Sequence, residues 1–167
     1  MHPGEVSLVA KYTFQKMLDK IDKSILKMLQ EDAHITNREI SLKLHLTTTP
    51  VHERIKRLEK EGYIKKYVAL LDKEKLEKGL TVFCNVSLKQ HTNENGKKLV
   101  KEIQSIPEVV ECYNIAGDYD FLLKILVKDM PAYQKFVLGV LGTLKSIGSV
   151  KSIFVMGEIK QTTGIPF

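Results

Sequence analysis

The stretch Leu44–Tyr67, "LHLTTTPVHERIKRLEKEGYIKKY", determines the first part of the fold. It begins with three threonines and a proline, continues with dense charge, and ends in a glycine followed by two lysines. Thr47 is a favourable N-cap residue, and Pro50 falls in the first turn, where a missing N–H costs little. Gly62 suits the position just past a helix end. The stretch therefore predicts a helix that begins at Thr47 and ends at Gly62.

This helix is predicted to have one apolar side. Val51, Ile55 and Leu58 follow the i, i+4, i+7 spacing of a buried helical face. Arg54 falls on the flank near Glu61, which favours an internal ion pair for this arginine. On a helix with about 100° per residue, the side opposite the apolar residues is polar. That outward side carries Thr49, Glu53, Lys56, Arg57 and Lys60.

Two shorter helices are predicted before it. Apolar residues recur at helical spacing from Leu18 to Leu29, and this pattern stops near Asp32. In "TNRE", Thr36 stands three positions ahead of Glu39, which is the spacing of a capping box. A bracing helix followed by two helices joined by a short turn forms a helix-turn-helix. Residues 1–16 show no clean period, and we interpret them as part of an extension for which a helix is one option.

The excess positive charge lies in this helical part. The net charge of +6 favours a polyanionic partner. Between Thr36 and Lys66, eight Lys and Arg residues face four acids, whereas from Asp72 onward thirteen Lys residues face eleven acids. Threonine hydroxyls and free amides at the positive helix end suit phosphate or base edges. The sequence therefore favours double-stranded DNA as a partner over the alternative of a solvated helix inside a bundle.

We expect the DNA contacts to come from the second and third helices and the lysines that follow. For His52 a partly buried packing role stays open beside a contact with DNA. The expected DNA-binding residues are Asn37, Arg38, Thr47, Thr48, Thr49, His52, Glu53, Lys56, Arg57, Lys60 and Lys65.

The second part of the chain alternates strands and helices. "YIKKYVALLD" from Tyr63 predicts an extended strand, and Leu80–Leu88 alternates apolar and polar residues with the strand period of two. "NGKKLVKEIQSI" predicts a helix whose apolar side carries Leu99, Val100, Ile103 and Ile106. "EVVECYNIA" and "DFLLKILV" predict the two strands of a hairpin. "PAYQKFVLGVLGTLKSI" then predicts a second helix, and "SVKSIFVMGEI" predicts a final strand. The order β-α-β-β-α-β is that of a ferredoxin-like domain, with both helices on one face of an antiparallel sheet.

The other face of this sheet also needs a cover. Apolar residues occupy the alternate positions of its strands, and a homodimer that meets through these faces is the simplest solution. The residues of this second face are Phe83, Leu122, Leu126, Ile153 and Val155.

Other features of the sequence exclude several classes of site. Cys84 and Cys112 lie outside any CxxC spacing, so we expect ordinary half-buried thiols in a reducing cytosol. The five histidines form no ligand pair at helical spacing, and we expect no metal site. A leader with a basic end and an apolar run is missing, and no stretch is apolar enough for a membrane span. We expect a cytoplasmic protein that does not contact membranes.

The chain resembles the Lrp/AsnC family of "feast or famine" regulators from about Leu18 to Thr163. The likeness rests on "LDKIDKSIL", "ITNREIS", "TPVHERIKRLEKEGYIKKYVALLD", "ECYNIAGDYDFLLKI" and "DMPAYQKF". It implies an α+β fold with a three-helix winged helix-turn-helix, a hinge strand and a ferredoxin-like βαββαβ domain for effector binding and assembly. We accordingly divide the chain into an extension (1–17), a DNA-binding domain (18–64), a hinge strand and linker (65–78) and a C-terminal domain (79–167).

The resemblance also implies a mechanism. Similar proteins are dimers that often assemble to octamers, regulate transcription by sequence-specific DNA binding, and sense an amino acid between C-terminal domains. "GDYD" can equally be a plain hairpin turn, since Gly and Asp favour turns. By resemblance, the effector-binding residues are Gly117, Asp118, Tyr119, Asp120, Met130, Ile153, Phe154 and Val155.

Three departures from the family pattern limit what can be transferred. His45 replaces the usual glycine in the turn between the second and third helices, so it must adopt a left-handed backbone there. Thr47 and Thr48 replace a common Ser-Pro, which leaves the base preference open. Asn114, Ile153 and Phe154 differ from leucine-responsive members, which leaves the effector open, including the option of none.

An enzyme is the rival interpretation. Some proteins similar to this family decarboxylate tetrapyrroles such as sirohaem, which requires acid–base histidines or arginines in the C-terminal cleft. After Asp72 the chain has only His91 and no arginine. We therefore expect a regulator without catalytic residues or a cofactor, apart from an amino acid effector.

Overall fold

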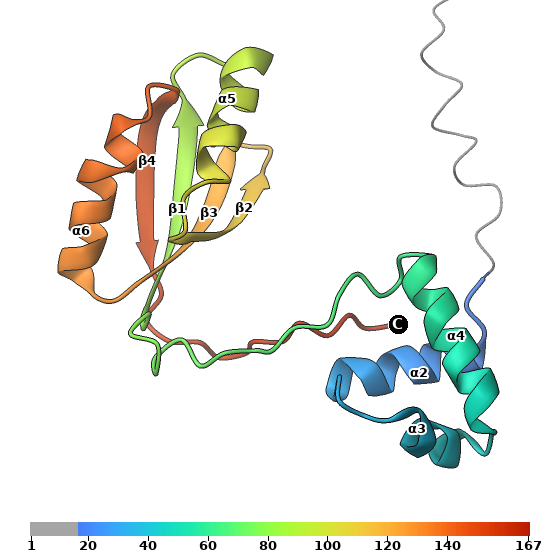
Figure 1. Cartoon of the computed structure of the whole chain (residues 1–167). Coiled ribbons are helices and arrows are strands. Elements are labelled where there is room, and N and C mark those ends of the chain that lie inside the picture. The colour runs from blue at the N-terminus through green and yellow to red at the C-terminus, as the bar shows by residue number, and fades with distance from the viewer. Residues whose placement is uncertain (1–16) are drawn as a thin grey trace, which may run out of the picture. The chain divides into compact units, whose positions relative to one another are not determined.

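The computed structural model describes residues 17–167 (Figure 1). The expectation for residues 1–16 lies outside the described part of the chain. Two compact units are present: one ends at Ala69 and includes Thr162–Phe167, and the other is Leu70–Gln161. None of the helices described is long and apolar enough to cross a membrane.

From residue 17 onward, the first unit contains three helices: α2 (Lys20–Glu31), α3 (Asn37–Leu44) and α4 (Thr48–Lys60). Their buried faces make one small core, which confirms the predicted inward side of α4. The fully or almost fully buried core residues are Ile25, Ile40, Val51, Ile55 and Leu58.

The starts of α2 and α3 are held by capping boxes. The predicted box is confirmed: Thr36 Oγ1 accepts a hydrogen bond from the Glu39 N–H (3.2 Å), and Glu39 Oε2 accepts one from the Thr36 N–H (2.7 Å). Asp19 and Asp22 form a second box at α2, which the sequence analysis did not anticipate because its N3 residue is an aspartate. Thr47 is the N-cap of α4 as predicted, yet its hydroxyl makes no capping bond.

The turn between α3 and α4 has the expected left-handed residue. His45 has φ 54° and ψ 42°, the conformation that glycine adopts without a Cβ penalty. Gly62, just past α4, has φ 79° and confirms the predicted helix end.

The predicted strand at Tyr63–Asp72 is wrong for this structure. Within residues 17–167 no strand lies between α4 and β1, and Figure 1 draws this segment as a coil without a strand arrow. An extended segment becomes a strand only when a neighbouring chain satisfies its backbone groups, and no described segment pairs with this one.

The second unit has the predicted βαββαβ order. Its four strands pair antiparallel in the order β2-β3-β1-β4. The elements are β1 (Leu80–Leu88), α5 (Asn93–Ile103), β2 (Val109–Asn114), β3 (Phe121–Val127), α6 (Met130–Gly139) and β4 (Ile147–Phe154).

Both helices pack on one face of this sheet (Figure 1). Val82 and Cys84 on β1 are fully buried there against Leu99 of α5 and Phe136 of α6. Val100, predicted on the inner side of α5, is instead 37% exposed. On the opposite face Phe83, Leu122 and Leu126 are half-buried and Ile153 is 45% exposed, so apolar surface is left uncovered by any described helix.

The last helix is shorter than predicted. α6 ends at Gly139, a 3₁₀ turn occupies Leu141–Thr143, and β4 begins at Ile147. Gly139 and Gly142 lower the helix propensity of this stretch, which apolar spacing alone did not reveal.

The C-terminal residues differ from the expected division of the chain. The Gln30 side chain donates to the Ile165 carbonyl (3.2 Å) and accepts from the Ile165 N–H (2.6 Å). Thr162–Phe167 therefore packs with the helical unit rather than with the sheet.

Replacing His45 with glycine tests the strained turn. Because glycine adopts φ 54° without a Cβ clash, His45→Gly should raise the free energy of unfolding by about 1 kcal/mol in chemical denaturation. Lys43→Gly, inside α3, is the matched control and should lower it by about the same amount. A loss of stability in His45→Gly equal to that of the control would contradict this account of the turn.

Candidate functional site

Most of the predicted DNA-binding residues lie at the surface of the helical unit. Asn37 and Arg57 are only partly exposed, as described below. The exposed members of the set are Arg38, Thr47, Thr48, Thr49, His52, Glu53, Lys56, Lys60 and Lys65.

The N-terminus of α4 differs from those of the other two helices. α2 and α3 carry Asp22 and Glu39 in their first turns, and both have side-chain caps. The first turn of α4 has no acid and no side-chain cap, while Thr47, Thr48 and Thr49 are exposed. The first backbone N–H groups of a helix have no intrahelical partner and carry partial positive charge. This end of α4 can therefore accept an anionic group.

His52 is linked to α3 through Asn37. The Asn37 amide nitrogen lies 3.2 Å from His52 Nδ1, and His52 is exposed, so a packing role in the core is excluded. When the amide donates, Nδ1 is the acceptor and the ring proton resides on Nε2. His52 then presents an N–H donor on the side away from Asn37.

Lys56 lies on the outward side of α4, as predicted. Its side chain is 64% exposed, and Nζ is 3.1 Å from Glu59 Oε2 within the same helix. An exposed pair of this kind contributes little to stability, so Lys56 remains available to an outside partner.

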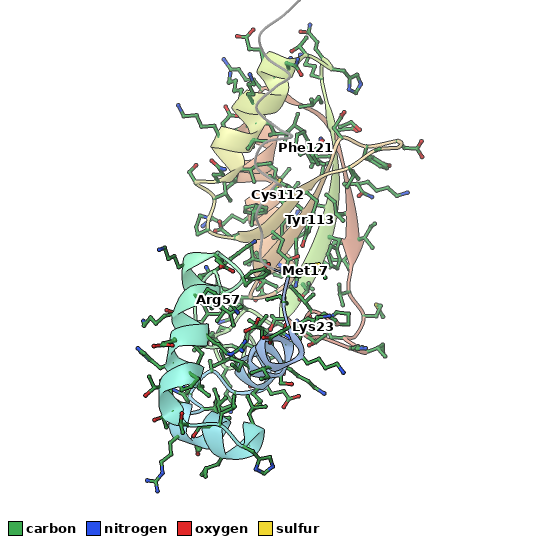
Figure 2. All side chains as sticks on the ribbon, turned by 90° about the vertical axis from the view of Figure 1, so that its right-hand side faces the viewer. Met17, Lys23, Arg57, Cys112, Tyr113 and Phe121 are labelled. Carbon is green, nitrogen blue, oxygen red and sulfur yellow. The ribbon has the colours of Figure 1, made fainter. Side chains whose placement is uncertain are left out.

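Arg57 does not lie on the outward side, and that prediction is wrong. Its Nη2 is 2.6 Å from Asp22 Oδ1 of α2. Figure 2 shows Arg57 on the side of α4 that faces α2. Periodicity within α4 could not reveal this, because the acid that binds Arg57 belongs to another helix.

Arg54 forms an internal ion pair as expected, but with other partners than Glu61. Its Nη1 lies 2.6 Å from Asp19 Oδ2 and 2.7 Å from Asp22 Oδ1. Burial raises the pKa of the Asp22 carboxyl, but hydrogen bonds from Arg54 and the Asp19 N–H, together with the charge of Arg57, outweigh burial and lower it overall. Asp22 is therefore a charged, buried carboxylate, and the sequence analysis missed it.

The predicted effector hairpin is tied to the end of β1. Gly117 has φ 132°, which glycine alone adopts readily. Asp120 Oδ2 accepts a hydrogen bond from the Leu88 N–H (2.7 Å), and Oδ1 lies 3.0 Å from His91 Nδ1. Asp118 is exposed, and Tyr119 is half-buried. Neither of these partners of Asp120 was predicted from the sequence.

The remaining effector residues do not line one surface of a single chain. In the β1–β4 register, Phe154 pairs with Val82 on the helix-covered face, while Ile153 pairs with Phe83 on the uncovered face. Phe154 packs edge-on against Tyr133 of α6, with ring centres 5.2 Å apart.

Met130, at the start of α6, is 52% exposed, and Val155 follows β4 half-buried. Because Ile153 and Phe154 face opposite ways, the eight predicted residues do not lie on one face of the sheet.

Two protein families match the two parts of the chain. A winged helix-turn-helix DNA-binding family matches residues 18–65, and the Lrp/AsnC ligand binding domain matches residues 81–165.

Curated relatives match along most of the chain. The DNA-binding transcriptional activator DecR of Escherichia coli (strain K12) is 38% identical over 150 residues, covering 90% of this chain and 99% of DecR. The leucine-responsive regulatory protein of Salmonella typhimurium is 38% identical over 147 residues, covering 88% of this chain and 90% of the relative.

Solved structures agree with these relatives. A transcriptional regulator from Neisseria meningitidis in complex with L-Met has a TM-score of 0.86 at 36% identity, covering 90% of this chain and 97% of that one. An AsnC family transcriptional regulator from Agrobacterium tumefaciens has a TM-score of 0.85 at 38% identity, covering 89% and 97%. The chain belongs to the Lrp/AsnC family of DNA-binding transcriptional regulators.

Proposed function

We propose that α4 is the recognition helix and that it enters the major groove with its N-terminal turn first. The observation that carries this proposal is the first turn of α4, which has exposed threonines, no acid and no side-chain cap. Such a turn suits phosphate and base edges better than it suits a neighbouring helix.

The geometry supports a separate proposed role for each of these residues. Thr48 and Thr49 offer hydroxyls and amides to a phosphate, and His52 offers its Nε2–H to an acceptor such as N7 or O6 of a purine. Lys56 and Lys60 meet the DNA backbone, where they add affinity without reading sequence. The main role proposed for Asn37 is to orient the ring of His52, and a direct contact with DNA is secondary.

The uncovered face of the sheet supports a homodimer. Phe83, Leu122, Leu126 and Ile153 leave apolar surface there, and a second copy would cover it. A dimer with two-fold symmetry presents two recognition helices to major grooves about 34 Å apart and reads a roughly palindromic site. Further assembly, up to an octamer, would bend or wrap the DNA.

An amino acid is the proposed effector. The C-terminal unit matches a ligand binding domain, and one similar regulator is in complex with L-Met. Backbone amides at Gly117 suit an α-carboxylate, and Asp120 suits an α-ammonium group. Because Ile153 and Phe154 face opposite ways, the site is expected where two copies meet, so effector binding would change assembly.

A regulator rather than an enzyme is the proposal that fits best. The named relatives are transcriptional regulators, and the sequence after Asp72 holds only His91 and no arginine for acid–base chemistry. We favour this over a sirohaem decarboxylase and place the protein in the cytoplasm, where its DNA lies.

Reversing the charge of Lys56 tests the outward side of α4. Lys56→Glu should weaken binding to a selected operator by about tenfold at 0.1 M salt, because a phosphate contact becomes a repulsion. Fluorescence anisotropy measures the affinity, and the free energy of unfolding should change by no more than about 0.5 kcal/mol. Lys101→Glu, on α5, is the control and should leave DNA binding unchanged. A large loss of stability in Lys56→Glu would contradict the outward placement.

A single charge tests the effector site. Asp120→Asn keeps an acceptor for the Leu88 N–H but removes the negative charge, so amino acid affinity should fall about tenfold or more by calorimetry. L-methionine is titrated first, followed by a panel of other amino acids. His91→Gln is the control variant, because it changes a neighbour of Asp120 but keeps the Asp120 charge. Equal affinities in Asp120→Asn and the parent for every amino acid that binds would remove Asp120 from the site.

The dimer depends on the uncovered sheet face. Phe83→Asp places a charge in that face and should reduce the molar mass of the assembly, measured by sedimentation equilibrium, to half or less of the parental value. Operator binding should weaken as a result. Val100→Asp changes an exposed apolar residue of α5 and should leave the mass as in the parent. An assembled Phe83→Asp protein would show that the copies meet elsewhere.

A further inference from the structure

Asp22 is the most buried charged side chain in the helical unit described, with 1% of its side chain exposed. Its carboxylate contacts Arg54 Nη1 (2.7 Å) and Arg57 Nη2 (2.6 Å), both on α4, and accepts a hydrogen bond from the Asp19 N–H (3.1 Å). A carboxylate is costly to bury unless opposite charges and hydrogen bonds satisfy it. One buried acid of α2 therefore contacts two cations of α4, and Arg54 is also paired with Asp19 Oδ2 (2.6 Å).

The flank of α4 around Asp22 does not favour an anion. An open hollow there is lined by Asp19, Pro50, Glu53, Arg54 and Arg57. Together with Asp22, its three carboxylates exceed its two guanidinium groups by one charge. A phosphate at this flank would meet net negative charge, in contrast to the first turn of α4 and to Lys56 and Lys60.

We propose that Asp22 is a positioning residue that sets the specificity of DNA binding by withholding Arg54 and Arg57 from the phosphate backbone. The inference rests on the proposed role of α4 as the recognition helix. If the side chains of Arg54 and Arg57 on α4 were free, they would bind the phosphates of any duplex equally well, because phosphate contacts carry no sequence information. When both arginines are held in ion pairs, a larger share of the DNA-binding free energy comes from contacts that depend on sequence than when they are free.

The salt dependence of binding separates this role from a purely structural one. Each phosphate neutralised by a cation adds about 0.9 to the slope of log affinity against log salt, whatever the sequence. Removing the charge of Asp22 should release Arg57, whereas Arg54 keeps its pair with Asp19. The slope should therefore steepen by about 1, and affinity for random DNA should rise. A purely structural role for Asp22 predicts lower affinity for operator and random DNA alike, with an unchanged slope.

The experiment compares the full chain with Asp22→Asn, which keeps the size of the side chain. Fluorescence anisotropy over a salt series measures binding to a selected operator and to a scrambled duplex. We expect a slope steeper by about 1 or more, tighter binding to the scrambled duplex and an operator preference reduced about fivefold or more. Glu31→Gln, an exposed acid on the same helix, is the matched control and should behave as the parent.

A triple variant shows whether the arginines cause the effect. Asp22→Asn with Arg54→Gln and Arg57→Gln should return to the parental slope, because no cation is released. An unchanged slope in Asp22→Asn, or a steeper slope that persists in the triple variant, would overturn the inference. A parent protein without salt-dependent DNA binding would instead overturn the proposed role of α4.

If Asp22→Asn does not fold, Arg57→Gln provides the test, because Asp22 keeps Arg54 as its partner. Removing an already neutralised cation should leave the slope as in the parent. Lys60→Gln removes an exposed cation one turn away and should lower the slope by about 1. A slope lowered equally in Arg57→Gln and Lys60→Gln would overturn the inference.

Discussion

The contact between the buried Asp22 carboxylate and two arginines of α4 is the constraint on which the DNA-binding surface depends. Apolar packing of Val51 and Leu58 decides which side of α4 faces the core, but packing alone tolerates small rotations of a helix. The hydrogen bond from Arg54 Nη1 to Asp22 Oδ1 (2.7 Å) is directional, and the ion pair of Arg57 with the same oxygen (2.6 Å) adds a second attachment, so together they limit rotation. With α4 in this orientation, the Lys56 side chain is 64% exposed.

The C-terminal unit carries a different constraint, since the helices described for residues 17–167 cover only one face of its sheet. Ile153 and Phe154 are neighbours in β4 but point to opposite faces, and Asp120 connects the hairpin to the end of β1. We propose that a ligand that touches several of these residues binds where copies of the chain meet. Assembly and effector binding would then share one surface, and a linkage between effector and DNA affinity would be reciprocal.

Local features of the structure could be predicted from the sequence, whereas tertiary partners could not. The capping box of Thr36 and the left-handed turn at His45 depend on residues within a few positions of each other, and both were predicted. Arg57 was placed on the wrong side because its partner lies on α2, 35 positions away from it in the chain. The segment after Tyr63 was predicted as a strand although a strand requires a partner that one chain does not supply. The effector residues came from resemblance, which gives positions along β4 but not the faces they occupy.

Hydrogen exchange of the full chain, measured with and without a selected operator duplex, tests the central claim that α4 docks in DNA. Amides of the first turn of α4, at Thr48 and Thr49, have no intrahelical acceptor and exchange readily unless a ligand covers them. The account predicts that DNA slows their exchange while the solvent-facing amides at the start of α5 are unaffected. Unchanged exchange at Thr48 and Thr49 in a saturated complex would contradict it.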